Sequence, residues 1–499
     1  MPTPRTPALA LALALLAGGW SAAAPAQAAA EAPLVRSTDP GADRLRAVGS
    51  LVSAEGSHCT ATVVTGPGQV SAEADALVVT SGHCVSGRLG TNEVLVDQEP
   101  AEGWSFTPAY FADTVAQHRR VGVRKVRYAT MKSLDMAVVQ LTVSYADLAA
   151  QRIRPFRLDP RAATPGTRVE LAHIPVMIDS EERYLRRSLC TGGDRYDLVE
   201  HVWYWPRGWV NDCAGVHGGS SGSPVLVAGT DRIAAVLNTT VEPDYSGACY
   251  LGRPCELTPT APRMRTGASY ASGLEAVAGC FTADRFDPRA AGCRLPHPRP
   301  LELSNRNPYT RSTVTDPEGT VRPARWKLEL KATGASHARI KTGPAASTDC
   351  AAPDGYGPVF ALADRPVFEE PVDRRENLYL ACVVAGPGAR PGSGWQPYTE
   401  ATMGLLRVDD TPPTVRPVIS VHESDDSYRV DPIFQTWEIT GYLVKHGPKA
   451  GTDCASSDGY RTYIRIPTTL DKAKGPWRFC AIGLDYADNP TPPAVRDLA

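Results

Sequence analysis

Three side chains of this protein lie in short stretches whose composition suits nucleophilic catalysis. Ser221 lies in Gly-Ser-Ser-Gly-Ser-Pro, His83 in Thr-Ser-Gly-His-Cys, and Asp135 in Leu-Asp-Met-Ala-Val-Val. A serine hydroxyl is a weak nucleophile at neutral pH and needs an adjacent base, which an imidazole can provide. A buried carboxylate then holds the imidazole in one tautomer and stabilises its protonated form. The chain order His, Asp, Ser is one of three unrelated orders of this triad.

The elements that must position these residues are short strands. Residues 46–280 contain β-rich runs separated by Gly, Pro and Asp, a pattern typical of a sandwich or barrel. Asp135 directly precedes an apolar run, as expected for an acid at the start of a buried strand. We therefore expect an all-β fold. The runs include residues 61–65, 76–80, 94–96, 136–143, 224–227 and 233–237.

These motifs and their spacing resemble those of chymotrypsin-fold serine endopeptidases, and are most similar to the V8-type glutamyl-endopeptidase branch and its secreted trypsin-like relatives. The resemblance covers residues 46–280, about half of the chain. It implies a two-barrel fold, with His83 as general base, Asp135 as orienting acid and Ser221 as nucleophile. It also implies an oxyanion hole formed by the backbone N–H groups of Gly219 and Ser221.

The chain departs from these relatives in three places. Ser220 replaces the aspartate that pairs with a new amino terminus in digestive trypsins, so activation by that ion pair is not supported. Gly215, six positions before Ser221, replaces the pocket carboxylate of enzymes that prefer Arg or Lys, although Asp212 is nearby. Residues 234–240 lack the histidine that binds glutamate side chains in glutamyl endopeptidases. The cleavage preference is therefore left open.

Several residues near the site admit more than one interpretation. Ser220 or Ser223 could be the nucleophile in place of Ser221, although the glycine pattern favours Ser221. His217 lies four positions before Ser221 and could border a substrate cleft. The aromatic run Trp203 to Trp209 could form core or a substrate-facing wall. The sequence Asn-Thr-Thr at 238–240 matches a glycosylation acceptor, which we interpret as coincidental.

Twelve cysteines without any Cys-x-x-Cys spacing indicate disulfides rather than a metal or redox site. We expect no metal and no organic cofactor. Neighbouring cysteines suggest six pairs as hypotheses, of which Cys59–Cys84 is the strongest because it would join the histidine loop to the preceding strand. The others are Cys190–Cys213, Cys249–Cys255, Cys280–Cys293, Cys350–Cys382 and Cys454–Cys480.

The N-terminal residues have the composition of a secretory signal. A basic residue is followed by an apolar stretch too short for a membrane span and by a small-x-small cleavage site, so residues 1–30 are predicted to be a signal peptide. No later stretch reads as transmembrane, and we expect an exported, extracellular or periplasmic protein. The net charge of −2 over 499 residues argues against nucleic acid as a partner.

The last 200 residues contain an internal repeat. Lys-Thr-Gly-Pro at 341–344 recurs as Lys-His-Gly-Pro at 445–448, and Asp-Gly-Tyr at 354–356 recurs at 458–460, each 104 positions later. Each unit also has one cysteine pair, and together these features resemble bacterial immunoglobulin-like repeats. The expected organisation is a lead at 31–45, a protease-like domain at 46–286, a linker at 287–322, and repeats at 323–411 and 412–499.

Three functions follow from this organisation. The leading hypothesis is a secreted serine endopeptidase that acts on proteins or peptides, with repeats that bind a surface or polymer or act as spacers. The first alternative is an adhesion or binding protein with an inactive protease-like domain. The second is an esterase-like hydrolase, which normally has the order Ser, Asp, His on an α/β sheet.

Overall fold

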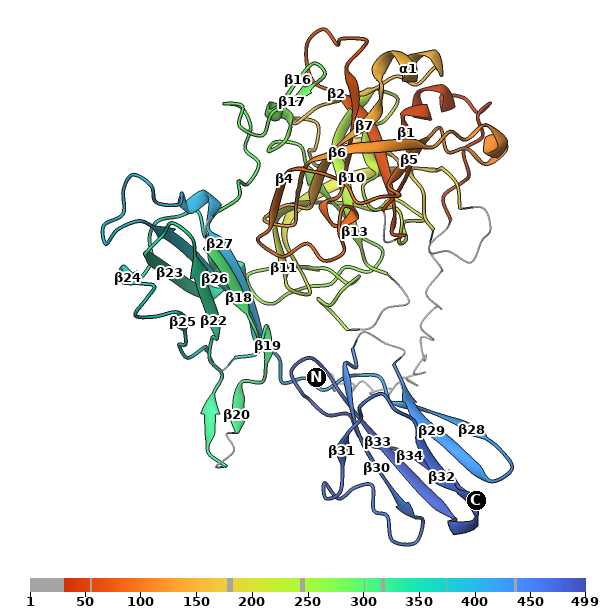
Figure 1. The fold of residues 1–499 in the computed structure, drawn as a ribbon, viewed down its shortest axis with the longest axis vertical. Helices are drawn as coiled ribbons and strands as arrows, with labels where there is room; N and C mark the ends of the chain where they lie inside the picture. Colours follow the sequence, from red (N-terminus) through yellow and green to blue (C-terminus); the bar gives the residue numbers. More distant parts are fainter. Residues whose placement is uncertain are drawn as a thin grey trace, which may run out of the picture.

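The protein folds as two antiparallel β-barrels followed by two smaller β modules, in agreement with the expected all-β, two-barrel chymotrypsin-like architecture (Figure 1). The computed structural model describes residues 31–53, 56–176, 183–242, 247–299, 301–315, 319–373, 375–434 and 438–499. The predicted signal peptide at 1–30 lies outside the described residues. Among the described residues, no helix has the length and apolar character that crossing a bilayer requires.

In the first barrel, each strand pairs with the next in the order β1-β5-β6-β7-β3-β2, and β2 pairs back with β1 to close the ring. The strand β4 (Val94–Gln98) adds to β6. The ring strands are β1 (Val48–Val52), β2 (His58–Thr65), β3 (Asp75–Thr80), β5 (Ser105–Pro108), β6 (Val121–Thr130) and β7 (Met136–Ser144).

The second barrel closes in the same way, in the order β9-β10-β11-β15-β13-β12, with β12 paired back to β9. The short strand β8 (Phe156–Leu158) pairs in parallel with β2 and with β13, and so joins the two barrels. The ring strands are β9 (Arg168–His173), β10 (Arg186–Glu200), β11 (Trp203–Asn211), β12 (Pro224–Val227), β13 (Arg232–Thr240) and β15 (Ser269–Gly273); β14 (Cys255–Glu256) pairs with β10.

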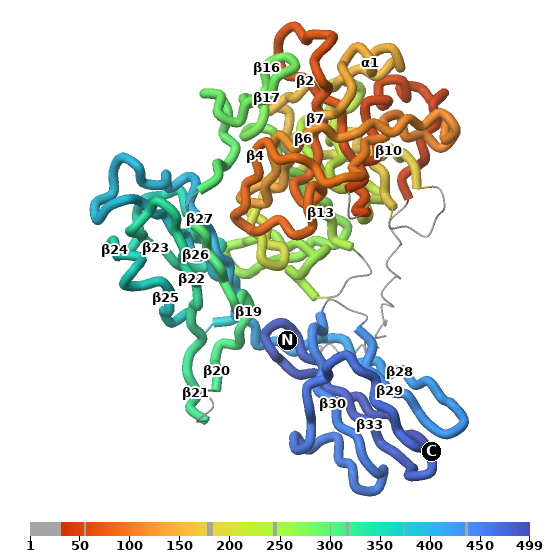
Figure 2. The backbone as a smooth tube through the Cα atoms, viewed as in Figure 1, coloured from red at the N-terminus to blue at the C-terminus, as the bar shows by residue number. Residues whose placement is uncertain are grey.

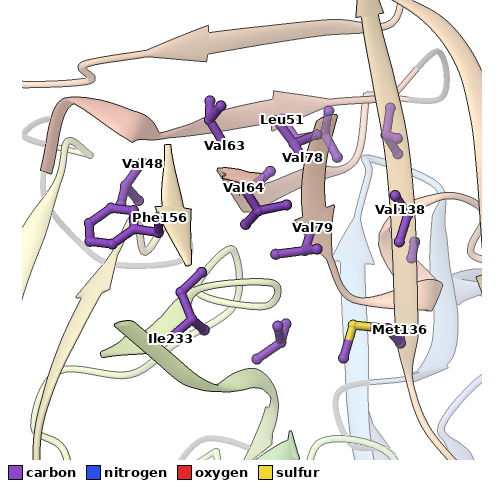
Figure 3. Packing of buried hydrophobic residues seen from close by; sticks show 14 of the residues in the cluster. Val48, Leu51, Val63, Val64, Val78, Val79, Met136, Val138, Phe156 and Ile233 are labelled. Carbon is purple, nitrogen blue, oxygen red and sulfur yellow. The ribbon is translucent and has the colours of Figure 1, made fainter. Parts of the chain in front are cut away.

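Burial of the apolar strand residues explains why these segments form barrels. Side chains of β2, β3 and β7 fill the first barrel with almost no exposure, and a β8 phenylalanine and a β13 isoleucine extend the same core (Figure 3). Such burial contributes about 1.5–3 kcal/mol for each large apolar side chain. Residues labelled in the figure are Val48, Leu51, Val63, Val64, Val78, Val79, Met136, Val138, Phe156 and Ile233.

Each C-terminal module contains two main sheets; Figures 1 and 2 show the first module to the left of the barrels and the second below them. The first module has the sheets β18-β22-β25 and β19-β27-β26-β23-β24, and the second has β28-β29-β32 and β31-β30-β33-β34. The strands of the first are β18 (Leu301–Asn305), β19 (Tyr309–Thr310), β22 (Leu328–Ala332), β23 (His337–Pro344), β24 (Phe360–Ala361), β25 (Val367–Phe368), β26 (Asn377–Gly386) and β27 (Thr402–Val408). Those of the second are β28 (Val418–Glu423), β29 (Ser427–Ile433), β30 (Gly441–Pro448), β31 (Arg461–Thr462), β32 (Thr468–Asp471), β33 (Trp477–Leu484) and β34 (Ala494–Leu498).

The other elements are short. The rest of the described chain contains one α-helix, two short hairpins and several 3₁₀ turns. They are α1 (Tyr145–Ala150), β16 (Phe281–Thr282) with β17 (Arg285–Phe286), β20 (Thr313–Thr315) with β21 (Val321–Pro323), η1 (Ala42–Ala47), η2 (Gly82–Cys84), η3 (Ala112–Gln117), η4 (Ala278–Cys280), η5 (Ala345–Ser347), η6 (Tyr398–Glu400) and η7 (Lys472–Lys474).

Part of the predicted linker at 287–322 has regular structure. Residues 301–305 form β18 and pair with β22, because their alternating apolar side chains complete the first module's core. The preceding stretch lies against the first barrel, where Leu295 is buried and the Tyr128 hydroxyl donates to the Pro296 carbonyl at 2.8 Å. The expected polar lead at 31–45 is likewise partly buried, since its apolar residues lie against the barrels.

Equivalent residues of the two sequence repeats make the same hydrogen bonds in the two modules. Lys341 Nζ donates to the carbonyl oxygens of Ala352 and Asp354, and 104 positions later Lys445 Nζ donates to those of Ser456 and Asp458. Tyr356 and Tyr460 each donate a hydroxyl hydrogen bond to the first cysteine carbonyl of their module, at 2.9 Å in both. The two modules therefore share one local structure.

All twelve cysteines are paired in six disulfides, and the pairs coincide with the six suggested by the sequence. Cys59–Cys84 joins β2 to the turn that carries His83. Each C-terminal module contains one bridge, Cys350–Cys382 or Cys454–Cys480.

Candidate active site

A cleft of about 590 Å³ is lined by residues of both barrels and contains His83, Asp135 and Ser221. His83 and Asp135 come from the first barrel, after β3 and before β7, and Ser221 comes from the loop before β12 in the second. The structure thus brings together three residues that are 52 and 86 positions apart in the sequence.

His83 is oriented by Asp135 through two contacts. The Asp135 Oδ2 atom lies 2.6 Å from Nδ1 of the imidazole, and Oδ1 accepts from the His83 backbone N–H at 3.0 Å. Asp135 is almost fully buried, whereas part of the His83 ring faces the cleft. Burial disfavours the imidazolium, but the charge of Asp135 and its hydrogen bond outweigh this, so the pKa of His83 is raised. The arrangement favours a proton-accepting imidazole whose protonated form is stabilised.

The Ser221 loop is held by main-chain hydrogen bonds to both barrels. The Ser221 carbonyl accepts from the Thr60 N–H at 2.8 Å, and the Gly222 N–H donates to the Leu237 carbonyl at 2.8 Å. The Ser221 hydroxyl donates to the Asn238 carbonyl at 3.3 Å. Within the described part of the chain, no hydrogen bond joins this hydroxyl to His83, a separation that is common in structures without substrate.

The exposure of the three neighbouring serines distinguishes them. Ser220 and Ser223 are buried, and the Ser223 hydroxyl donates to the Ser220 carbonyl at 2.6 Å. Ser221 is only partly buried and lines the cleft beside His83. Of the three, Ser221 therefore has the geometry that a nucleophile requires.

Several backbone N–H groups of this loop, among them those of Gly219 and Ser221, have no acceptor among the hydrogen bonds of the described residues. The N–H groups of Ser220 and Ser223 do have acceptors, the carbonyls of His217 and Ser220 respectively. Gly219 has φ +96°, a conformation that favours glycine. Two unpaired donors beside a cleft serine are suited to a developing negative charge.

The Ser220 hydroxyl contacts a buried histidine, His173, which the sequence did not mark as part of the site. His173 Nδ1 lies 2.9 Å from the Ser220 hydroxyl, and the His217 N–H donates to the same hydroxyl at 3.3 Å. Burial, with the charges of Arg186 and His217, lowers the pKa of His173 to about 3. The histidine of this buried pair is therefore neutral.

Asn238 is a second residue that sequence reasoning missed as part of the site. Its side-chain amide donates to the Asp135 carbonyl at 2.6 Å and to the Ser81 hydroxyl at 3.1 Å. The side chain is buried, so a glycan on this nitrogen is incompatible with the fold, in agreement with the coincidental interpretation of the acceptor sequence.

Glu200, at the end of β10, is a buried carboxylate in the cleft lining and was also missed. Its Oε1 accepts from the Gly252 N–H at 2.7 Å. Burial raises the pKa of Glu200 to about 7, partly offset by the Thr239 hydroxyl and the Gly252 N–H. No sequence pattern marked this residue, because its surroundings come from distant segments.

The aromatic run Trp203 to Trp209 was predicted to form either core or a substrate-facing wall, and its residues do both. Trp203 and Trp205 line the cleft with stacked rings whose centroids are 6.2 Å apart. Trp209 is fully buried in the second barrel. The run is therefore a cleft wall at one end and core at the other.

The remaining sequence candidates near the site also have defined places. His217 lines the cleft, with Nδ1 3.4 Å from a Glu242 carboxylate oxygen. Gly215 lies against the backbone of Ala32, and an added Cβ would come within 2.4 Å of the Ala32 nitrogen. Asp212 lines a separate depression of about 190 Å³ and accepts from the Thr191 N–H. Asp212 thus lies outside the cleft lining.

One set of three possible metal ligands occurs among the described residues: Cys59, His83 and Cys84. The two sulfur atoms are bonded to each other, and a disulfide sulfur carries no thiolate to bind a metal ion.

A scan against protein-family models and a search of curated proteins give no match to this chain. Solved structures that resemble it include a thermostable serine protease, AL20, from an extremophilic microorganism, with 14% identity and a TM-score of 0.31 over 46% of this chain and 92% of that one. Protease Anisep from Arthrobacter nicotinovorans has 14% identity and a TM-score of 0.30, over 46% and 91%. An inactivated protease paralogue of the scabies mite has 14% identity and a TM-score of 0.30, over 49% and 94%. Similarity at this level carries no conclusion about activity.

Proposed function

We propose that this protein is a secreted serine endopeptidase in which His83, Asp135 and Ser221 form the catalytic triad. The observation that carries the proposal is their convergence in one cleft beside the N–H groups of Gly219 and Ser221, which have no acceptor among the described residues. Each group has the chemical property that its assigned role requires.

In the proposed reaction, Ser221 Oγ attacks the carbonyl carbon of a peptide bond as His83 Nε2 accepts the hydroxyl proton. The oxygen of the tetrahedral intermediate accepts hydrogen bonds from the Gly219 and Ser221 N–H groups. His83 then protonates the departing amine, which leaves an acyl group on Ser221. Water, deprotonated by His83, attacks this ester; the bond to Ser221 Oγ then breaks, His83 returns the proton to Oγ, and the acid product is released. Asp135 stabilises the imidazolium in both halves.

Secretion and the nature of the modules belong to the same proposal. Six disulfides and the predicted signal peptide at 1–30 favour an oxidising compartment outside the cytoplasm. The similarity to V8-type enzymes and the assignment of the modules at 323–411 and 412–499 as immunoglobulin-like repeats rest on the sequence motifs. Such modules would bind a surface or polymer and raise the local substrate concentration.

A second candidate is a binding protein with an inactive protease-like domain. The observation that favours it is the hydrogen bond of the Ser221 hydroxyl to the Asn238 carbonyl, with none to His83 among the described residues. If this geometry persists when substrate is bound, His83 cannot take the proton.

Labelling with a fluorophosphonate probe separates the two candidates. The probe reacts with an activated serine, so we expect the purified, oxidised protein to be labelled and Ser221→Ala not to be. Ser57→Ala, which changes another serine of the cleft lining, is the matched control and should label like the parent. A folded parent that does not react, even after mild proteolysis near residues 31–48, would favour the binding protein.

A further inference from the structure

The C-terminal modules contact the second barrel close to one wall of the candidate cleft. We define the cleft wall as Glu200, Trp203, Trp205, Leu251 and Gly252, all of which line the cleft. These residues come from the β10–β11 hairpin and from the loop before β14. The Gly252 N–H hydrogen bond to Glu200 joins the two segments.

Directly behind the cleft wall lies a cluster of four rings, His201, Tyr250, Tyr309 and Tyr486, which we call the tyrosine junction. The rings come from three different parts of the chain: the barrels, β19 of the first module, and the loop after β33 of the second. Tyr309 and Tyr486 stack with centroids 4.7 Å apart, and Tyr250 lies 5.7 and 5.4 Å from them. Figure 1 shows β19 at the edge of the first module that is nearest to the second.

The tyrosine junction touches both segments of the cleft wall. His201 lies one position after Glu200, its ring contacts Trp203 at a centroid distance of 5.7 Å, and its N–H donates to the Cys249 carbonyl at 2.9 Å. Tyr309 meets this histidine directly, with its hydroxyl 2.9 Å from Nδ1. Trp203 in turn stacks on Trp205. A continuous series of ring contacts therefore runs from the second module to the cleft.

Polar contacts fix the loop that carries Tyr250. Arg407 of the first module donates to the Ala248 carbonyl at 2.8 Å and lies 4.5 Å above the Tyr250 ring. The same arginine pairs at 3.0 Å with Asp409, which accepts from the Tyr250 hydroxyl. Asn489 of the second module donates to the Asp409 carbonyl at 2.8 Å. Both modules thus contact the loop or the residues that hold it.

We propose that Tyr309, Tyr486 and Arg407 are positioning residues that hold the cleft wall, so that the modules are needed for peptide cleavage but not for the reactivity of Ser221. The inference rests on the proposed function, and it assigns the modules a role in the site besides binding a surface. His83, Asp135 and Ser221 are attached to other segments, and among the described residues no hydrogen bond or ring contact joins them to the tyrosine junction. Ser221 should therefore stay reactive when the contacts between the tyrosine junction and the cleft wall are removed.

Tyr486 offers a matched set of variants. Its contacts with the tyrosine junction are ring contacts, so Tyr486→Phe should preserve them and Tyr486→Ala should remove them. Tyr463→Ala removes a tyrosine of the same module whose ring contact is with Phe434, and serves as the control. Because a wall displaced by about 1 Å can cost 10²-fold in rate, casein cleavage by the full-length Tyr486→Ala variant should fall at least about tenfold in kcat/KM. Fluorophosphonate labelling should stay within about threefold of the parent, and the Phe and control variants should match the parent in both assays.

Hydrogen exchange gives a readout that does not depend on activity. In Tyr486→Ala, the amides of His201 and Gly252 should exchange faster than in the parent, because the contacts that hold their hydrogen bonds are weakened. Unchanged exchange in these segments, unchanged casein cleavage, or equal loss of cleavage and labelling would each overturn the inference. An unlabelled parent would instead contradict the proposed function, while exchange still tests the junction. If Tyr486→Ala does not fold, Tyr309→Phe replaces it. This variant removes only the hydroxyl that contacts His201, and its cleavage, labelling and exchange are compared with those of the parent in the same way.

Discussion

The side-chain amide of Asn238 donates a 2.6 Å hydrogen bond to the main-chain carbonyl of Asp135 and so joins the second barrel to the first at the candidate site. The Asn238 carbonyl accepts the Ser221 hydroxyl hydrogen bond, which places one residue in contact with both the acid and the proposed nucleophile. Asn238 therefore fixes the relative position of groups that come from different barrels.

Replacing Asn238 should lower both stability and activity. In Asn238→Ala the Asp135 carbonyl loses a buried donor, which costs about 1–3 kcal/mol of unfolding free energy. The loss of position at the acid should lower kcat/KM by about 10²-fold. Thermal unfolding and casein cleavage measured side by side test this. Full activity in a folded Asn238→Ala variant would show that this contact does not position the site.

Activity should rise with pH through the pKa of His83, since the base must be neutral to accept a proton. This pKa is raised above its usual value of 6.5, chiefly by Asp135 against the effect of burial, so the acid limb should lie above pH 6.5. Asp135→Asn should move the limb to lower pH and reduce kcat by about 10⁴-fold, as the loss of this acid does in the chymotrypsin triad. The pH dependence of kcat/KM in parent and variant provides the measurement. A limb that stays in place would mean that Asp135 does not control the imidazole.

Glu200 should make stability fall as pH rises from about 4.5 to 7. Its folded pKa is raised from 4.5 to about 7, so the folded protein binds the proton more tightly than the unfolded chain. The stabilising effect is complete below pH 4.5 and is lost as pH passes 7, a difference on the order of 3 kcal/mol.

In Glu200→Gln this part of the pH dependence should disappear. Denaturant unfolding of parent and variant at several pH values gives the difference, and Glu99→Gln, at an exposed carboxylate, is the matched control. Parallel stability curves for parent and Glu200→Gln would contradict a raised pKa at this residue.

Gly222 should tolerate no side chain. Its φ is +83°, and an added Cβ would lie 2.1 Å from both the Thr60 carbonyl oxygen and the Thr80 hydroxyl. Gly222→Ala should therefore displace the Ser221 loop and abolish fluorophosphonate labelling. Gly87→Ala is the control, because an added Cβ there meets nothing within 4 Å. Normal labelling of Gly222→Ala would show that the loop can shift without losing the nucleophile.

The all-β class, the cysteine pairs and the internal repeat could be predicted from the amino-acid order because each has a local or periodic signal. Short strands alternate with turn residues, and bonded cysteines lie only 6 to 32 positions apart. The candidate residues His83, Asp135 and Ser221 stood out because each lies in a short stretch of characteristic composition. Their convergence in one cleft could only be expected from a resemblance.

The other residues of the site depend on closure of the two barrels and on how the modules lie against them. Asn238 meets Asp135 across 103 positions, and Tyr250 meets Asp409 across 159. Glu200 and His173 acquire shifted pKa values only because distant segments exclude water around them. Such contacts leave no periodic or local pattern, since each partner is chosen by strand register and by the packing of separate sheets. The strand β18, inside the predicted linker, has no local signal for the same reason: it is a strand only because β22, more than 20 positions later, pairs with it.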